Sequence, residues 1–270
     1  MEDIFKIPRL KKTFERGIQV HGYIYNRPCL LNLMRQFTNL KNLIKPAKTR
    51  FATAFLTLSR IHQQKNNLRK MITSEEWSTS KWAKEPHGKA VSQTLLMPSF
   101  WNNVVFALKV SGPLVKVLRL TDTEKKPPMG YIYEAMDRAK ECIEKSFNFK
   151  EEKYKEVFDI IDRRWEVQLH RPLHAAGHLL NPEFFYDNPE IESNHEVMGG
   201  FLDCVDKLVP DLSIVDLITT ELSTYIKSEG LFGRPVAIRQ RKTRSPGNIQ
   251  FDTNFKLLNM HFILTSHYSS

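Results

Sequence analysis

The stretch YKEVFDIIDRRWEVQL (154–169) indicates the fold class more clearly than any other part of the chain. Its apolar residues recur every three or four positions, at Tyr154, Val157, Phe158, Ile161, Trp165 and Leu169. This spacing places them on one face of a helix, which can pack on a core while the charged residues meet solvent. The sequence therefore predicts a helix here, with Asp159, Asp162 and Glu166 on its polar side.

The same helical period extends through most of the chain. A helix is expected to begin after Pro98, and others are expected over residues 30–44, 51–72, 129–147, 196–209 and 213–228. Gly230 stands where a C-terminal cap is expected. Gly112-Pro113 should kink or break its helix, because proline lacks an amide donor and clashes with the preceding turn. Since Ile18–Tyr25 alone shows the weak alternation of a strand, the predicted fold is mostly α.

Composition limits the class of protein. The chain has 270 residues, of which 41% are hydrophobic and 26% charged, as in globular proteins of one domain or two small ones. Mean hydropathy is -0.40, and no apolar run approaches the roughly 18 residues of a membrane span, so no membrane association is expected. The first residues do not resemble a signal peptide. Cys29, Cys142 and Cys204 are widely spaced, which favours buried, reduced thiols of an intracellular protein over a disulfide or metal framework.

Positive charge is concentrated in the first quarter of the chain. Residues 1–70 hold 15 Lys and Arg against three acids, a net charge of +12, whereas residues 71–270 hold 25 against 27. Such asymmetry favours a polyanionic partner, although a solvated basic face explains it equally well. Lys41, Lys45, Lys48 and Arg50 are grouped around Pro46, where a helix is expected to begin and its free amides attract anions. Arg50 is as consistent with a buried structural role as with phosphate contact.

Other candidate sites have simpler explanations. His170, His174 and His178 are spaced four apart, but Pro172 and Gly177 interrupt that helix, so packing or solvated histidines are favoured over a zinc site. Asp159, Asp162 and Glu166 are expected on an ion-paired surface, and Asp203 with Asp206 likewise. Trp77, Trp82 and Trp101 are expected in the core rather than stacked on bases. Because no phosphate loop, GxSxG or HExxH occurs, enzymatic activity is not supported.

Several long segments resemble the hAT superfamily of DNA transposases, most closely the plant-type branch that carries an N-terminal BED zinc finger. The resemblance extends in order from Met1 to about Thr243. Its segments are KPAKTRFATAFLTL (45–58), SEEWSTSKWAKEPHGKAV (74–91), PSFWNNVVFALKVSGPLVKVLRLTD (98–122), EKKPPMGYIYEAMDRAKECI (124–143), RRWEVQLHRPLHAAGHLLNPEFFY (163–186), VMGGFLDCVDKLVPD (197–211) and YIKSEGLFGRPVAIRQRK (225–242).

The resemblance implies a ribonuclease H-like enzyme in which three carboxylates hold two divalent metals and a helical insertion interrupts the core. Partial carboxylate sets cannot support two-metal chemistry. None of the three matches a residue of this chain, so we expect a truncated, inactive derivative with no cofactor and with core strands largely missing. Thr49-Arg50-Phe51 matches the family's Thr-Arg-Trp/Phe element, which adds Thr49 to the candidate nucleic-acid-binding residues Lys41, Lys45, Lys48 and Arg50.

The resemblance also suggests how the chain is organised. A basic helical segment is expected over 1–72, the helical insertion domain over 73–233, and a basic linker with a poorly ordered tail over 234–270. Weak, nonspecific DNA binding in the nucleus is the expected activity, and related transposase-like proteins are possible partners. The alternative is a domesticated helical module that binds other proteins and not DNA.

Overall fold

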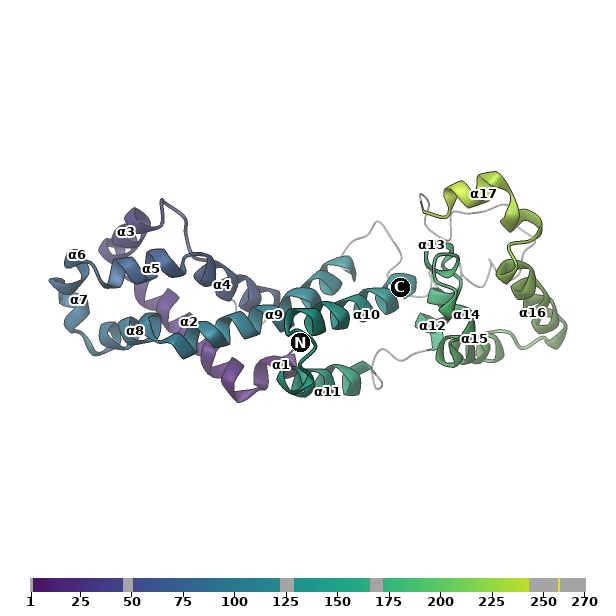
Figure 1. Cartoon of the computed structure of the whole chain (residues 1–270), viewed down its shortest axis with the longest axis horizontal. Coiled ribbons are helices and arrows are strands. Elements are labelled where there is room, and N and C mark those ends of the chain that lie inside the picture. Colours follow the sequence, from purple (N-terminus) through teal and green to yellow (C-terminus); the bar gives the residue numbers. More distant parts are fainter. Residues whose placement is uncertain (1, 46–50, 122–128, 166–171, 243–256, 258–270) are drawn as a thin grey trace. The chain divides into compact units, whose positions relative to one another are not determined.

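The chain is mostly α-helical. The computed structural model describes residues 2–45, 51–121, 129–165, 172–242 and 257, and these contain no strand (Figure 1). The predicted fold class is thereby confirmed, but the strand suggested for Ile18–Tyr25 is wrong, because those residues form the second half of helix α2 (Pro8–Tyr25). No helix within the described ranges is both long and apolar enough to cross a membrane.

Contacts between residues divide the chain into two compact units. Unit 1 comprises Met1–Lys116 and Cys142–Ile161, and unit 2 comprises Val117–Glu141 and Asp162–Ser270. These two units are defined by packing, and their boundaries differ from those of the three predicted segments, 1–72, 73–233 and 234–270. The three-segment organisation remains a prediction.

The helices before residue 122 mostly belong to unit 1. They are α1 (Glu2–Lys6), α2 (Pro8–Tyr25), α3 (Pro28–Phe37), α4 (Phe51–Gln63), α5 (Lys65–Ile72), α6 (Glu75–Ser78), α7 (Lys81–Lys84), α8 (Pro86–Leu96) and α9 (Pro98–Thr121). Three further elements contribute residues to this unit, namely α10 (Met129–Ser146), η1 (Glu151–Lys153) and α11 (Lys155–Arg164). The remaining helices of unit 2 are α12 (Pro172–Leu179), α13 (Pro182–Phe185), α14 (Glu190–Ser193), α15 (His195–Leu208), α16 (Leu212–Ile226), η3 (Gly230–Gly233) and α17 (Pro235–Gln240).

Helix α2 is the central element of unit 1, packing against α3, α4 and α8. Pro8 begins it, as proline readily does at a first helical position. Leu10, Gly17 and Ile24 lie on its buried face at helical spacing. Burial along this face outweighs the weak alternation near Tyr25, because most helical stability in proteins comes from packing.

Two predicted helix ends are displaced. Helix α3 ends at Phe37, not near Ile44, because Asn39 and Leu40 adopt left-handed conformations with φ of 52° and 62°. The Leu40 amide then donates to the Arg35 carbonyl at 2.9 Å, a Schellman closure, and its side chain is 76% exposed. At the end of α16 the left-handed residue that follows the cap is Ser228, not Gly230.

The proline within α9 does not end that helix. Pro113 lies in a continuous helix that extends to Thr121. Of the predicted kink or break, the break is therefore wrong. Val110, Leu114 and Val115 are buried on either side of it. We infer that this burial offsets the loss of one backbone hydrogen bond, a cost of roughly 3 kcal/mol for proline inside a helix.

Unit 2 has its own apolar core, built around α12, α15 and α16. Helices α12 and α15 approach so closely that a side chain added at Gly200 would place its Cβ only 2.6 Å from that of Ala175. Tyr225 is fully buried and its hydroxyl donates to the Leu179 carbonyl at 3.1 Å. Leu257 also belongs to this core, with 1% of its surface exposed, and its amide donates to the Glu221 carboxylate at 2.7 Å.

Some residues of the segment predicted as linker and tail pack on unit 2. Helix α17 lies within it, and Arg241 packs its guanidinium 3.5 Å from the centre of the Tyr186 ring. Arg241 also donates to the Phe232 carbonyl at 3.1 Å. Together with Leu257, these contacts attach residues beyond 234 to the core of unit 2.

Candidate nucleic-acid interface

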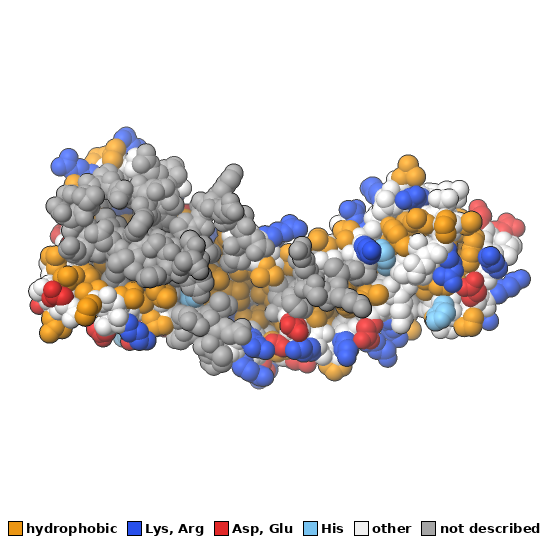
Figure 2. All heavy atoms as spheres, turned by 180° about the vertical axis from the view of Figure 1, so that it is seen from behind, with side chains coloured by type: hydrophobic (Ala, Val, Ile, Leu, Met, Phe, Trp, Pro, Cys, Tyr) orange, Lys and Arg blue, Asp and Glu red, His pale blue; other side chains and the backbone are white. Residues whose placement is uncertain are grey.

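The two units differ strongly in charge. Unit 1 has 24 Lys and Arg against 11 Asp and Glu, a net charge of +13, whereas unit 2 has 16 against 19, a net charge of -3. On the face seen in Figure 2, lysine and arginine side chains are dispersed and interspersed with acids. On that face, any phosphate contacts therefore have to come from local groups of cations and not from one continuous basic patch.

Lys41 and Lys45 of the predicted interface are described, and both are exposed. They lie in the loop that follows α3, which we call the basic loop and define as residues 38–45. The other three candidates, Lys48, Thr49 and Arg50, lie outside the described residues. The structure thus places two of the five candidates at the surface of unit 1.

The basic loop is anchored by its backbone. The Tyr25 hydroxyl donates to the Leu43 carbonyl at 3.0 Å, and the Thr57 hydroxyl donates to the Ile44 carbonyl at 3.3 Å. The Leu43 side chain is buried, and Arg35 donates to the Asn42 side chain at 3.1 Å. Helices α2, α3 and α4 therefore all hold the segment that presents the two lysines.

His21 packs against Tyr25, which anchors the basic loop, and was not identified from the sequence. Its ring is 6% exposed and stacks on Tyr25 with centroids 4.1 Å apart. The His21 pKa is lowered, first by burial and second by the positive charge of Lys45. Because 24 positions of sequence separate His21 from Lys45, no periodic pattern could have predicted that Lys45 affects the His21 pKa.

Exposed cations also lie on other helices of unit 1. They include Lys11 and Lys12 on α2, Arg69 and Lys70 on α5, Lys81 and Lys84 on α7, and Lys89 on α8. Other basic side chains are engaged within the unit. Arg9, for example, stacks on Phe106 at 3.8 Å and pairs with Glu156 at 3.5 Å. Net charge therefore overstates the number of cations that can reach a phosphate.

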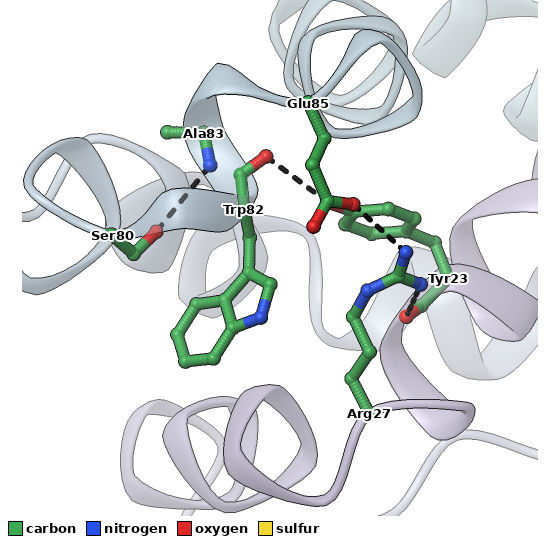
Figure 3. A network of polar contacts seen from close by, with 6 residues as sticks. All are labelled: Tyr23, Arg27, Ser80, Trp82, Ala83 and Glu85. Carbon is green, nitrogen blue, oxygen red and sulfur yellow. Dashed lines mark hydrogen bonds and ion pairs between the residues drawn. The ribbon is translucent and has the colours of Figure 1, made fainter.

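Arg27 is the clearest case of an engaged cation (Figure 3). It stacks 4.0 Å from the Tyr23 ring centre and donates to Glu85 at 2.8 Å and to the Tyr23 carbonyl at 3.3 Å. The Tyr23 hydroxyl lies 3.0 Å from the same carboxylate and 3.1 Å from the Trp82 carbonyl. Burial and the bond to Glu85 raise the pKa of Tyr23 to about 12. This network joins the end of α2 to the chain between α7 and α8 and gives Arg27 a structural role.

The tryptophans of unit 1 are mainly structural. Trp77 is 3% and Trp101 2% exposed, and the Trp101 indole donates to the Leu95 carbonyl at 2.8 Å. Trp82 is partly exposed. The preference for core packing over base stacking is thus confirmed for Trp77 and Trp101. The helix that carries Trp77, α6, is capped by Ser74, whose hydroxyl oxygen accepts from the Trp77 amide.

The histidine series does not form a metal site in the described part of the chain. His174 and His178 lie on α12 and are buried, while His170 lies outside the described residues. Nowhere in the described ranges are three or more His, Cys, Asp or Glu side chains placed to hold a metal ion. The α12 helix forms despite Pro172 and Gly177, since Pro172 occupies its first position.

The carboxylate and cysteine predictions have mixed outcomes. Asp162 pairs with Lys140 at 2.6 Å, and Asp159, Asp203 and Asp206 are exposed, as expected for a polar surface. Glu166 lies outside the described residues. The three cysteines are free, but only Cys204 is buried, so the expectation of three buried thiols is wrong for Cys29 and Cys142.

No family model, curated protein or solved structure matches this chain.

Proposed function

We propose that this chain is a non-catalytic, hAT-transposase-derived protein that binds nucleic acid weakly and without sequence preference through unit 1. The observation that carries the proposal is the anchored basic loop, which presents exposed Lys41 and Lys45 in a unit of net charge +13. The resemblance of the sequence to a DNA-handling family supports it. Nuclear localisation and the absence of catalysis follow from the same resemblance and belong to the proposal.

The proposed binding is electrostatic. Lysine ammonium groups contact phosphates without reading base edges, so affinity should be independent of sequence and steeply dependent on salt. If Lys41, Lys45, Lys48 and Arg50 each contact one phosphate, affinity should fall roughly 150-fold between 50 and 200 mM salt. The anchoring of Leu43 and Ile44 limits the entropy lost when the lysines bind.

Fluorescence anisotropy with a labelled DNA duplex of mixed sequence tests the proposal. We expect the Lys41→Glu/Lys45→Glu variant to bind at least tenfold more weakly at low salt. Its slope of log affinity against log salt should fall by roughly 1.8, or about 0.9 for each lost phosphate contact.

The matched control is Lys150→Glu/Lys153→Glu, which makes the same change in net charge at two other exposed lysines of unit 1. It should retain most of the affinity. Equal weakening in both variants would show that overall charge, and not the basic loop, drives binding. Absence of duplex binding by the unaltered chain at low salt would refute the proposal and favour the alternative of a protein-binding module.

A further inference from the structure

Unit 2 contains a cleft of about 550 Å³ whose walls come from α10, α11, α12, α14 and α15 and from residues beside them. Two aromatic rings, Tyr133 and Trp165, form part of it, and the carboxylates around it include Asp137, Glu190 and Glu196. A cavity of this size is large enough for a small molecule or for side chains of a docked peptide. We call it the acidic cleft.

The aromatic walls are held in place by contacts on several sides. The Tyr133 and Trp165 rings meet edge to face, with centroids 4.9 Å apart and an interplanar angle of 76°. Tyr133 also stacks on the buried His178 ring at 5.7 Å, and its hydroxyl donates to the Glu196 carboxylate. Burial and this hydrogen bond raise the Tyr133 pKa, so the ring carries a neutral phenol at physiological pH. A fixed, neutral aromatic wall attracts cations through its face.

Charge in the acidic cleft is predominantly negative. Among the residues that the structure describes, five carboxylates line the cleft and Lys140 is the one lysine or arginine. Lys140 pairs with Asp162 at 2.6 Å. The Asp137 pKa is raised, first by desolvation and then by the negative charge of Glu134, with Lys140 opposing. A second positive charge entering the cleft would therefore be stabilised by Asp137 and its acidic neighbours.

The chemistry of the lining favours an organic cation over a metal ion. The described residues include no group of three or more ligands arranged to coordinate a metal. A guanidinium or alkylammonium group instead gains from both features of the cleft, stacking on an aromatic face while it donates to carboxylates at the rim. Both groups occur on the side chains of basic polypeptides.

We propose that the acidic cleft binds an arginine or lysine side chain of a basic polypeptide segment, held between the Tyr133–Trp165 wall and the Asp137 and Glu190 carboxylates. Every residue of this site belongs to unit 2. The inference is therefore independent of DNA binding by unit 1, and either proposal can fail without the other.

The test uses the full chain and a fluorescein-labelled peptide of alternating arginine and glycine, followed by anisotropy at moderate salt. Asp137→Asn/Glu190→Gln removes two carboxylates of the cleft and is expected to weaken peptide binding at least fivefold. Trp165→Leu removes the Trp165 ring from the aromatic wall and should weaken peptide binding by a similar factor. If Trp165→Leu fails to fold, Trp165→Phe, which keeps an aromatic ring, should lose less than twofold.

The matched control is Asp206→Asn/Asp216→Asn, which removes the same charge from exposed positions of unit 2 outside the cleft. It should change affinity by less than twofold. The proposal is overturned if the peptide does not bind, if the control weakens binding as much as the cleft variant, or if removal of the Trp165 ring leaves affinity unchanged. The Lys41→Glu/Lys45→Glu variant should retain full peptide affinity, which separates this site from the basic loop.

Discussion

Replacing Gly88 by alanine should destabilise unit 1, although alanine normally favours a helix over glycine by about 1 kcal/mol. Gly88 is buried at the third position of α8. A Cβ there would lie 1.8 Å from the Trp82 carbonyl oxygen and 2.7 Å from the Tyr23 hydroxyl, whereas real Cβ contacts stay beyond 3.0 Å. The Trp82 carbonyl oxygen therefore has to move by more than 1 Å to bring the 1.8 Å contact out to 3.0 Å.

That movement should disturb the network in Figure 3, because the same carbonyl accepts the Tyr23 hydroxyl at 3.1 Å. Overpacking costs about 1–3 kcal/mol and a lost hydrogen bond about 1 kcal/mol. After subtraction of the helix preference, we expect a net loss of about 2 kcal/mol in unfolding free energy. For a unit of this size the transition midpoint should fall by roughly 6 °C.

Urea and thermal unfolding followed by tryptophan fluorescence measure this effect, since three of the four tryptophans (Trp77, Trp82 and Trp101) belong to unit 1. The matched control is Gly22→Ala on α2, where an added Cβ meets nothing within 4 Å. It should stabilise the chain by roughly 0.5–1 kcal/mol. If Gly88→Ala is as stable as the unaltered chain, or shifts in the same direction as Gly22→Ala, a Cβ at position 88 does not clash with the Trp82 carbonyl.

Two further predictions concern titratable groups. In the folded chain a thiol reagent should modify Cys29 and Cys142 rapidly and Cys204 only on unfolding, because Cys204 is 2% exposed and burial raises its pKa to about 11; rapid modification of all three would contradict its placement. His21 has a folded pKa below its ordinary value of 6.5, so its contribution to stability is complete above that pH and is lost as the pH falls and the unfolded state takes up a proton. Unfolding free energy should therefore decrease from pH 7 to pH 5 more steeply in the unaltered chain than in His21→Gln, and parallel pH profiles would show that the His21 pKa is not lowered by folding.

The elements that could be predicted are those with a local signal. The stripes of α10, α11, α15 and α16 depend on side chains three or four positions apart, and the structure has helices in all four places. Lys41 and Lys45 were chosen as candidates from the charge density of one short segment, and both are exposed. Helix ends were harder, because the left-handed residues Asn39 and Leu40 stop α3 without a glycine.

The candidate sites depended more on tertiary contacts. Trp165 was predicted on an inward apolar stripe and Asp162 on a polar flank, and no local pattern indicated that both would line one cleft with Tyr133 and Glu196. The anchoring of the basic loop by Tyr25 and Thr57 was equally hidden, since those residues lie on different helices. Contacts between distant segments have no fixed spacing in sequence.

The sequence by itself determined that the chain is helical and that its positive charge lies near its beginning, because helical periodicity and composition are local properties. Only the tertiary structure decided that Arg27 is engaged by Glu85, that α9 continues through Pro113, and that Leu257 joins the core of unit 2. Each of these outcomes depends on which distant side chains meet, and therefore on packing energy gained only once the chain has folded.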